Sequence, residues 1–326
     1  MTQETSVTQE TSITNHRATD TNAPLDDGEP TPIGHQATTW AAHADISARS
    51  ALVTILGDTI APLGGVVWLA DLIELVAPFG FNDRLVRTSM FRLAAEHWVT
   101  NERIGRRSRY SLTSFGREEF VNADARIYRR TTPAWDGLWT LVFLQADSIP
   151  DAELVRRLQW RGFAEMTKGV YASPNSDITA TRQLLDRLEF DPHPPLATAR
   201  FEEAGSITQM ESFRATSGLA TAQDGYRRFI DRYRWTQSKP VDDLGPSDAF
   251  LLRTMVIHDL RRARLHDPEL PGALLPADWV GDQAMALAGS VYRATTQAAW
   301  RWAETATGLT VDPFDPNLAL RFTSTT

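Results

Sequence analysis

The sequence contains no cysteine, which excludes disulfide bonds, thiolate metal sites and cysteine nucleophiles. Lysine is almost absent as well: Lys168 and Lys239 are the only two, so arginine carries nearly all of the positive charge. The seven histidines are scattered and show no HExxH or similar ligand spacing. We therefore expect neither a metal nor a cofactor.

Long hydrophobic runs and targeting signals are also missing. The most apolar region, residues 60–81, is interrupted by Asp71 and Glu74 and by two prolines. A membrane-spanning helix needs about 20 consecutive apolar residues. No basic-then-apolar signal peptide opens the chain. These features predict a cytoplasmic protein that does not enter a membrane.

The formal net charge of -8 is unevenly distributed along the 326 residues. Residues 1–46 hold seven acidic residues against the single Arg17, which leaves about -2 for the remainder. This segment is rich in Thr, Gln, Asp and Pro and has no apolar periodicity, so we expect a disordered acidic tail. The overall charge therefore says little about binding to nucleic acid.

Residues 82–94 have the pattern of a DNA-recognition helix. Val86, Met90, Leu93 and Ala94 form one apolar stripe at helical spacing, and Asn82 precedes them as a candidate N-cap. The opposite side is polar and arginine-rich. Arginine near the start of such a helix can bond guanine in the major groove. The DNA-contacting candidates on this helix are Arg84, Arg87, Thr88, Ser89 and Arg92.

Residues 99–112 have the pattern of a two-stranded wing. Tyr110 and Leu112 alternate with polar residues, residues 99–103 supply the partner strand, and Gly105 suits a positive-φ turn. The wing adds Arg106, Arg107 and Arg109 to the DNA-contacting candidates. Residues 84–109 contain seven arginines and only two glutamates. Such a local excess of positive charge favours DNA binding, although exposed arginines can also serve only to keep a surface solvated.

The chain as a whole predicts an α+β multidomain protein. We expect the disordered tail at 1–46, a winged-helix DNA-binding domain at 47–130, a ferredoxin-like middle domain at 135–210 and an all-helical domain at 213–326. The middle domain follows from a strand-helix-strand-strand-helix-strand order, with its last strand at 198–203 and a hairpin at Lys168-Gly169. Helical spacing at 226–233, 247–264 and 282–305 predicts the C-terminal helices.

Several long segments resemble the PaaX family of bacterial transcriptional repressors. They are APFGFNDRLVRTSMFRL at 77–93, GRRSRYSLT at 105–113, WDGLWTLV at 135–142, FLLRTMVIHDLRR at 250–262 and DPELPGALLPADW at 267–279. The resemblance spans residues 47 to about 305. It implies a homodimer that binds a double-stranded operator and represses a catabolic operon until an aromatic acyl-CoA effector, such as phenylacetyl-CoA, binds.

An acyl-CoA needs cations for its phosphates and an apolar slot for its acyl group. The effector-binding candidates are Arg253, His258, Arg261 and Arg262 on one long helix, with Tyr171 and Trp279 as aromatic walls. The competing interpretation is structural: these cations could tie domains together through carboxylates such as Asp259 and Asp267.

Two other classes of function stay open at this point. A ferredoxin-like domain could carry a metal-dependent nuclease, with Asp147 near the end of its first strand, but one carboxylate is a thin basis for metal chemistry. The chain could also be a non-catalytic interaction scaffold. The arginine-rich helix and wing favour a DNA-binding repressor that is not an enzyme.

Overall fold

The protein is described from a computed structural model. The structure describes Pro32, Ile33, His35, Thr39 and residues 47–128, 135–144, 152–188, 193–201, 206–310, 318 and 320–323. The predicted acidic tail and Asp147 lie outside the described residues, apart from the four isolated positions before residue 47. None of the helices in this part of the chain combines the length and apolar composition that a membrane span needs.

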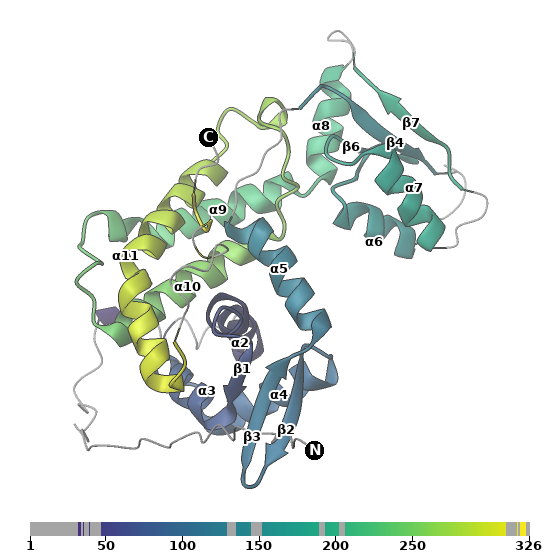
Figure 1. Ribbon diagram of the computed structural model, residues 1–326. Helices are drawn as coiled ribbons and strands as arrows, with labels where there is room; N and C mark the ends of the chain where they lie inside the picture. Colours follow the sequence, from purple (N-terminus) through teal and green to yellow (C-terminus); the bar gives the residue numbers. More distant parts are fainter. Residues whose placement is uncertain are drawn as a thin grey trace, which may run out of the picture. The chain divides into compact units, whose positions relative to one another are not determined.

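The N-terminal region is a helical unit with a small antiparallel sheet (Figure 1). Ser47 caps the first described helix by accepting a hydrogen bond from the Ser50 N–H. That helix continues directly into a short π-helix. The elements are α2 (Ala48–Ile55), η1 (Leu56–Ile60), β1 (Val66–Trp68), α3 (Leu69–Val76), η2 (Ala77–Phe79), α4 (Asp83–Ala95), β2 (Val99–Ile104), β3 (Arg107–Leu112) and α5 (Ser114–Tyr128).

The wing is the β2–β3 hairpin, and β1 pairs with the other edge of β3. Gly105 takes a φ of 61° in the turn, a conformation that glycine adopts without steric cost. The side chain of Thr113 accepts a hydrogen bond from the Gly116 N–H at 2.9 Å and starts α5. The helix predicted at 82–94, the hairpin and the helix that follows it are thus confirmed as elements of structure. The three-residue strand β1 was not predicted, because it is too short to show alternation.

The middle region is a four-stranded antiparallel sheet in the order β5-β6-β4-β7, as a ferredoxin-like fold requires. Its elements are β4 (Trp139–Phe143), α6 (Ala152–Trp160), β5 (Ala164–Thr167), β6 (Val170–Ser173), α7 (Ile178–Arg187), β7 (Leu196–Ala199) and α8 (Ser206–Thr216). Alternate residues of β4 face opposite sides of the sheet. Val142 packs with residues of α6 and α7, whereas Trp139 packs with Phe213 of α8.

Two details of the middle region differ from the sequence-based expectation. The last strand was expected at 198–203, but β7 ends at Ala199 because it pairs only along the short β4. Helix α8 was not predicted, since its apolar residues form no single stripe at helical spacing. Phe213 on α8 packs edge-on against Trp139 with ring centroids 4.9 Å apart. Tertiary packing therefore defines both elements.

The C-terminal region is helical, with α9 (Leu219–Tyr233), α10 (Pro246–Arg264) and α11 (Gly281–Thr307) packed on one another. Helix α10 also packs on α2 and α5, and α11 packs on α3. One hydrophobic core consequently runs from the N-terminal helices into α9, α10 and α11.

A buried network of charged and aromatic side chains lies inside this core. Asp58 of η1 accepts hydrogen bonds from Arg253 of α10 at 2.9 Å and from Arg321 at 3.1 Å. Tyr128 donates a further hydrogen bond to Asp58, at 2.6 Å. Both guanidinium groups also donate to the Tyr292 hydroxyl of α11. The network therefore connects η1, α5, α10, α11 and the C-terminal segment.

Aromatic rings and a second acid complete the surroundings of the two arginines. Arg253 lies 4.4 Å from the ring centre of Tyr292 and 4.5 Å from that of Trp300, while Arg321 lies over Tyr128. Arg321 also pairs with Asp124 of α5. Burial acts to raise the pKa of Asp58, but Arg253, Arg321 and Tyr128 hold it below its usual value. Asp58 is thus a buried carboxylate that stays charged.

We predict that Asp58→Asn destabilises the protein by about 3–5 kcal/mol, because it leaves the buried guanidinium groups short of negative charge. The matched control is Asp224→Asn, which removes an exposed acid from an exposed pair with Arg227 and should change stability by less than about 1 kcal/mol. Chemical unfolding of the full chain measures both. Equal effects of the two substitutions would show that the network contributes little.

Candidate nucleic-acid interface and ligand cavity

Helix α4 presents one apolar face to the core and one polar face to solvent. The side chain of Asn82 accepts a hydrogen bond from the Leu85 N–H at 2.9 Å, which confirms the predicted N-cap. Val86, Met90 and Leu93 are fully buried and fix the rotation of the helix about its axis. The remaining positions of α4 are directed away from the core.

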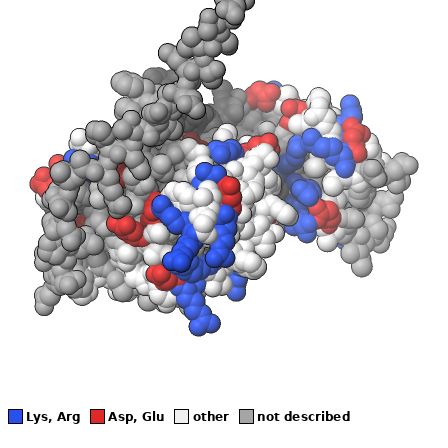
Figure 2. All heavy atoms as spheres, turned by 60° about the horizontal axis from the view of Figure 1, so that its bottom comes forward, with Lys and Arg blue, Asp and Glu red and all other residues white. Residues whose placement is uncertain are grey.

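The polar face of α4 carries four of the five predicted DNA-contacting residues in exposed positions. These are Arg84, Arg87, Thr88 and Arg92. Phe91 lies among them and is 72% exposed, the most exposed of the large hydrophobic side chains in the described residues. Figure 2 shows lysine and arginine side chains gathered on one face of the molecule, at the part that lies lowest in Figure 1, where the wing projects.

The fifth candidate on α4, Ser89, is wrongly placed by the sequence-based prediction. It is only 5% exposed, since it lies three residues after Val86 and next to Met90 on the buried side of the helix. A side chain in this position does not reach a ligand on the outer face. Ser89 instead belongs to the packing of α4 on the core.

The wing arginines are exposed to different degrees. Arg106 lies at the exposed tip of the hairpin, next to Gly105. Arg107 reaches back to Asp71 of α3 at 3.5 Å and lies 4.2 Å from the ring centre of Trp68. Arg109 pairs across the hairpin with Glu102 at 2.5 Å, in the register that places these two residues opposite each other.

The arginines of α4 also differ in whether they form an ion pair. Arg87 lies 3.7 Å from Asp83, one turn earlier on the same helix. Among the described residues, Arg84, Arg92, Arg103 and Arg106 have no carboxylate partner within ion-pair distance. These four guanidinium groups are available to phosphates without breaking an existing ion pair.

The effector-binding candidates are not brought together. Arg253 is 2% exposed and belongs to the network around Asp58, so its role is structural. His258 is fully buried, with Nδ1 3.1 Å from the Thr54 hydroxyl oxygen of α2. Burial, and secondarily Arg261 and Arg262, lower the pKa of His258 to about 3. It is therefore neutral at physiological pH.

The aromatic candidates lie in two separate places. Tyr171 is buried in the core of the middle sheet beside Val142. Trp279 packs edge-on against Tyr226 and lines a small cavity of about 40 Å³. Neither place has room for an acyl group. Arg262 is exposed on α10 and does not line the larger cavity described next.

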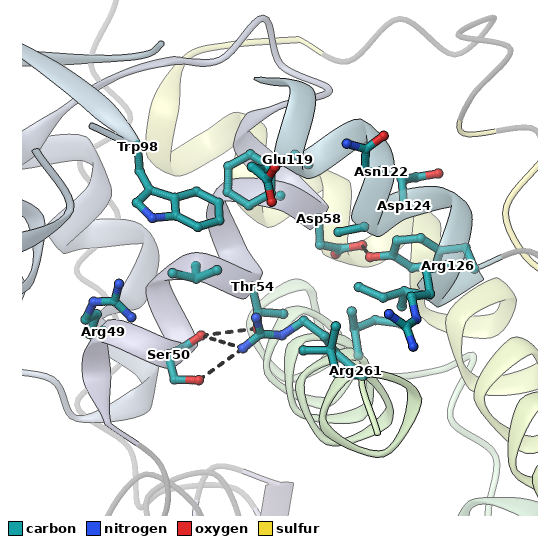
Figure 3. A pocket seen from close by; sticks show the side chains of 18 residues that line it. Arg49, Ser50, Thr54, Asp58, Trp98, Glu119, Asn122, Asp124, Arg126 and Arg261 are labelled. Carbon is teal, nitrogen blue, oxygen red and sulfur yellow. Dashed lines mark hydrogen bonds between the residues drawn. The ribbon is translucent and has the colours of Figure 1, made fainter. Parts of the chain in front are cut away.

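Arg261 is the one candidate that borders a large cavity, of about 420 Å³ (Figure 3). The cavity lies between α2, η1 and α5 on one side and α10 on the other. Sequence reasoning missed its other main residues, Arg49, Trp98, Phe120 and Arg126. They belong to the N-terminal region, whereas ligand candidates were sought from residue 171 onwards, and nothing in their spacing marks them as one site.

Comparison with protein-family models covers most of the chain. Residues 47–116 match the model described as PaaX-like protein. Residues 132–211 match the PaaX protein central Cas2-like domain, and residues 218–305 match the PaaX-like protein C-terminal domain. The three matches occur in the order of the three structural regions described above.

Individual relatives agree with the family models. The chain is 34% identical over 271 residues to the transcriptional repressor PaaX of Escherichia coli strain K12, covering 78% of this chain and 82% of the relative. A solved structure, the uncharacterized protein Rv0674 from Mycobacterium tuberculosis, has the same fold with a TM-score of 0.51 and 22% identity, over 80% of this chain and 98% of the other. The chain belongs to the PaaX family, a family of transcriptional repressors and not of enzymes.

Proposed function

We propose that the protein represses transcription by binding a double-stranded DNA operator through α4 and the wing. The observation that carries this proposal is the exposed arginine face of α4, together with the exposed Arg106 at the wing tip. Figure 2 shows that lysine and arginine side chains gather on this part of the molecule. A helix of this kind enters the major groove, where Arg84 and Arg87 bond base edges. Thr88, Arg92 and the wing residues Arg106, Arg107 and Arg109 then contact the sugar-phosphate backbone.

The proposed operator is an inverted repeat that a homodimer reads with two copies of α4. Most helix-turn-helix proteins bind half-sites about one helical turn apart, because protein and DNA share a two-fold axis. A second copy doubles the number of phosphate contacts without any change in the interface of one copy. Because α4 and the wing both lie within the proposed domain at 47–130, each copy in the dimer carries a complete helix and wing.

The proposed signal for release is an aromatic acyl-CoA such as phenylacetyl-CoA. A ligand that weakens operator binding 100-fold must favour the non-binding conformation by about 2.7 kcal/mol. The contacts of α10 with α2 and α5 support this part of the proposal, because they join the C-terminal helices to the DNA-binding region. Ligand-dependent movement of α10 would therefore act on the elements that hold α4.

We predict that Arg87→Ala weakens binding to the protein's own promoter region by about 1–3 kcal/mol, because a bidentate contact to a base is lost. Binding to scrambled DNA should weaken less. Fluorescence anisotropy measures both affinities, and Arg228→Ala, which removes an exposed arginine of α9, is the matched control. Unchanged sequence preference in Arg87→Ala would remove this residue from base recognition.

At the wing tip, Arg106→Ala is expected to weaken binding to promoter and scrambled DNA alike. The dependence of log affinity on log salt should fall by about one unit, because one phosphate contact is lost. Arg107→Ala should change this slope less, since Arg107 is already paired with Asp71. A salt titration of the three proteins tests this ranking, which an identical slope for Arg106→Ala and the wild type would contradict.

Phenylacetyl-CoA is expected to release the protein from its promoter region, whereas free CoA and phenylacetate at equal concentrations are not. The thioester alone combines the acyl group with the phosphates that the proposal requires. A gel-shift titration with the three compounds measures this. Retention of DNA at saturating thioester would rule out this effector and leave the DNA-binding proposal standing.

A further inference from the structure

The cavity beside Arg261 has the size and position of a ligand site. Its volume of about 420 Å³ falls within the 300–1,000 Å³ range of small-molecule pockets. Figure 3 shows the labelled side chains of α2, α5 and α10 arranged around an open centre. Of the other cavities of the described residues, one of about 460 Å³ borders Arg161 and His266 and has a mostly polar lining, and the one that Trp279 lines is about ten times smaller.

One side of the cavity is apolar. Apart from Trp98 and Phe120, whose rings are 5.4 Å apart, aliphatic side chains make up this wall. They are Val53, Ile127, Ile257 and Leu265. Such a surface favours an apolar or aromatic group, because covering it removes apolar area from water.

The other side is polar and holds the guanidinium group of Arg261 together with Asp58, Glu119 and Asp124, of which both aspartates are paired with Arg321. Among the described residues, Arg261 donates hydrogen bonds only to Ser50, to the hydroxyl at 3.0 Å and to the carbonyl oxygen at 3.4 Å. Its Nε atom is buried and has no hydrogen-bond partner among the described residues. Nor does any carboxylate of the described residues lie within ion-pair distance of Arg261.

This arrangement is energetically unusual. Burial lowers the pKa of Arg261, and the neighbouring Arg262 and Arg49 act in the same direction, opposed only by Tyr128. A buried cation that meets only neutral oxygens costs free energy that an ion pair would offset. Arg264, three residues later on the same helix, has such partners in Asp267 and Glu269.

We propose that this cavity binds a small organic anion with an aromatic or similarly sized apolar body, and that Arg261 receives its negative group. The inference rests on the proposed function, because it gives the effector a place in the protein. The shared chemistry is an arylacetyl group with negative charge, either as the free acid or as its CoA thioester. The free acid brings a carboxylate to Arg261, and the thioester brings phosphates.

The cavity has a direct connection to the recognition helix. Arg49 borders the cavity and forms an ion pair with Glu96, the residue that caps the C-terminal end of α4. The Nε atom of Arg49 is also buried without a hydrogen-bond partner among the described residues. The negative phosphates of the thioester attract Arg49 in competition with Glu96. Binding of the thioester, the proposed effector, therefore loosens the C-terminal end of α4.

The first experiment measures ligand binding to the full chain by calorimetry, with phenylacetate, phenylacetyl-CoA and free CoA as probes. Phenylacetate or its thioester should bind the wild type, and Arg261→Gln should weaken that binding at least tenfold. Arg228→Gln, which removes an exposed arginine outside the cavity, should bind as the wild type does. The probe that binds distinguishes the carboxylate from the phosphates as the anion.

A second variant reduces the volume of the cavity and leaves Arg261 unchanged. Ala123 of α5 lines the cavity and is half-buried, so Ala123→Trp should fill the space and abolish binding. In the wild type, binding should change the fluorescence of Trp98, and this change should be missing in Trp98→Phe. No binding of either arylacetyl probe to the wild type, or undiminished binding to Arg261→Gln, would overturn the proposal.

Unfolding of the ligand-free protein provides a test that needs no ligand. If Arg261 is kept for binding, Arg261→Gln should leave the melting temperature unchanged or raise it, because an uncompensated buried charge is removed. Arg264→Gln should lower it, since Asp267 then loses its buried partner. An equal loss of stability in both variants would assign Arg261 a structural role and overturn the proposal.

Promoter binding by the ligand-free wild type is measured separately, so the two proposals can fail independently. If the wild type does not bind its promoter but does bind an arylacetyl ligand through Arg261, the DNA-binding proposal fails and the cavity remains a ligand site with another function. DNA binding with no arylacetyl ligand in the cavity would overturn the cavity assignment alone.

Discussion

The charge of Asp58, held between two buried guanidinium groups, is the interaction on which the arrangement of the helices depends. Asp58 belongs to the π-helix that continues α2, while Arg253 and Arg321 come from sequence positions about 200 and 260 residues later. A buried carboxylate is stable only with such partners, and each arginine is stable only with the carboxylate. The N-terminal region and the C-terminal helices are therefore joined by groups that cannot be separated without exposing an unpaired charge to the apolar core.

Two of the four arginines of α10, Arg253 and Arg261, show how the partners of a guanidinium group distinguish a structural role from the proposed binding role. Arg253 has an acid, a hydroxyl and two aromatic faces around its guanidinium group, so nothing is left for a ligand to supply. Arg261, two turns further along, has a cavity on one side and, within the part of the chain that the structure describes, hydrogen bonds to Ser50 alone. The same residue type on one helix thus completes the core at one position and leaves an interaction open at the other.

The sequence predicted α4 and the wing well because their signals are local. The Asn82 cap, the stripe of Val86, Met90 and Leu93, and Gly105 each act within a few residues, and the structure contains all of them. Ser89 was misplaced because a polar residue inside an apolar stripe was counted with the outer face. The cavity was not predictable in the same way. Its walls come from residues up to about 215 apart, and the partner that removes Arg253 from the ligand candidates is Asp58, 195 residues earlier in the chain.

The exposed ring of Phe91 has a thermodynamic consequence for the free protein. At 72% exposure, on a face that also carries Arg84, Arg87 and Arg92, this side chain keeps apolar surface in contact with water until a partner covers it. Covering apolar surface carries a negative heat-capacity change and a gain in solvent entropy near room temperature, whereas pairing of arginine with phosphate is governed by salt. One helix face thus combines two driving forces that respond to different variables, so temperature and ionic strength act on its associations separately.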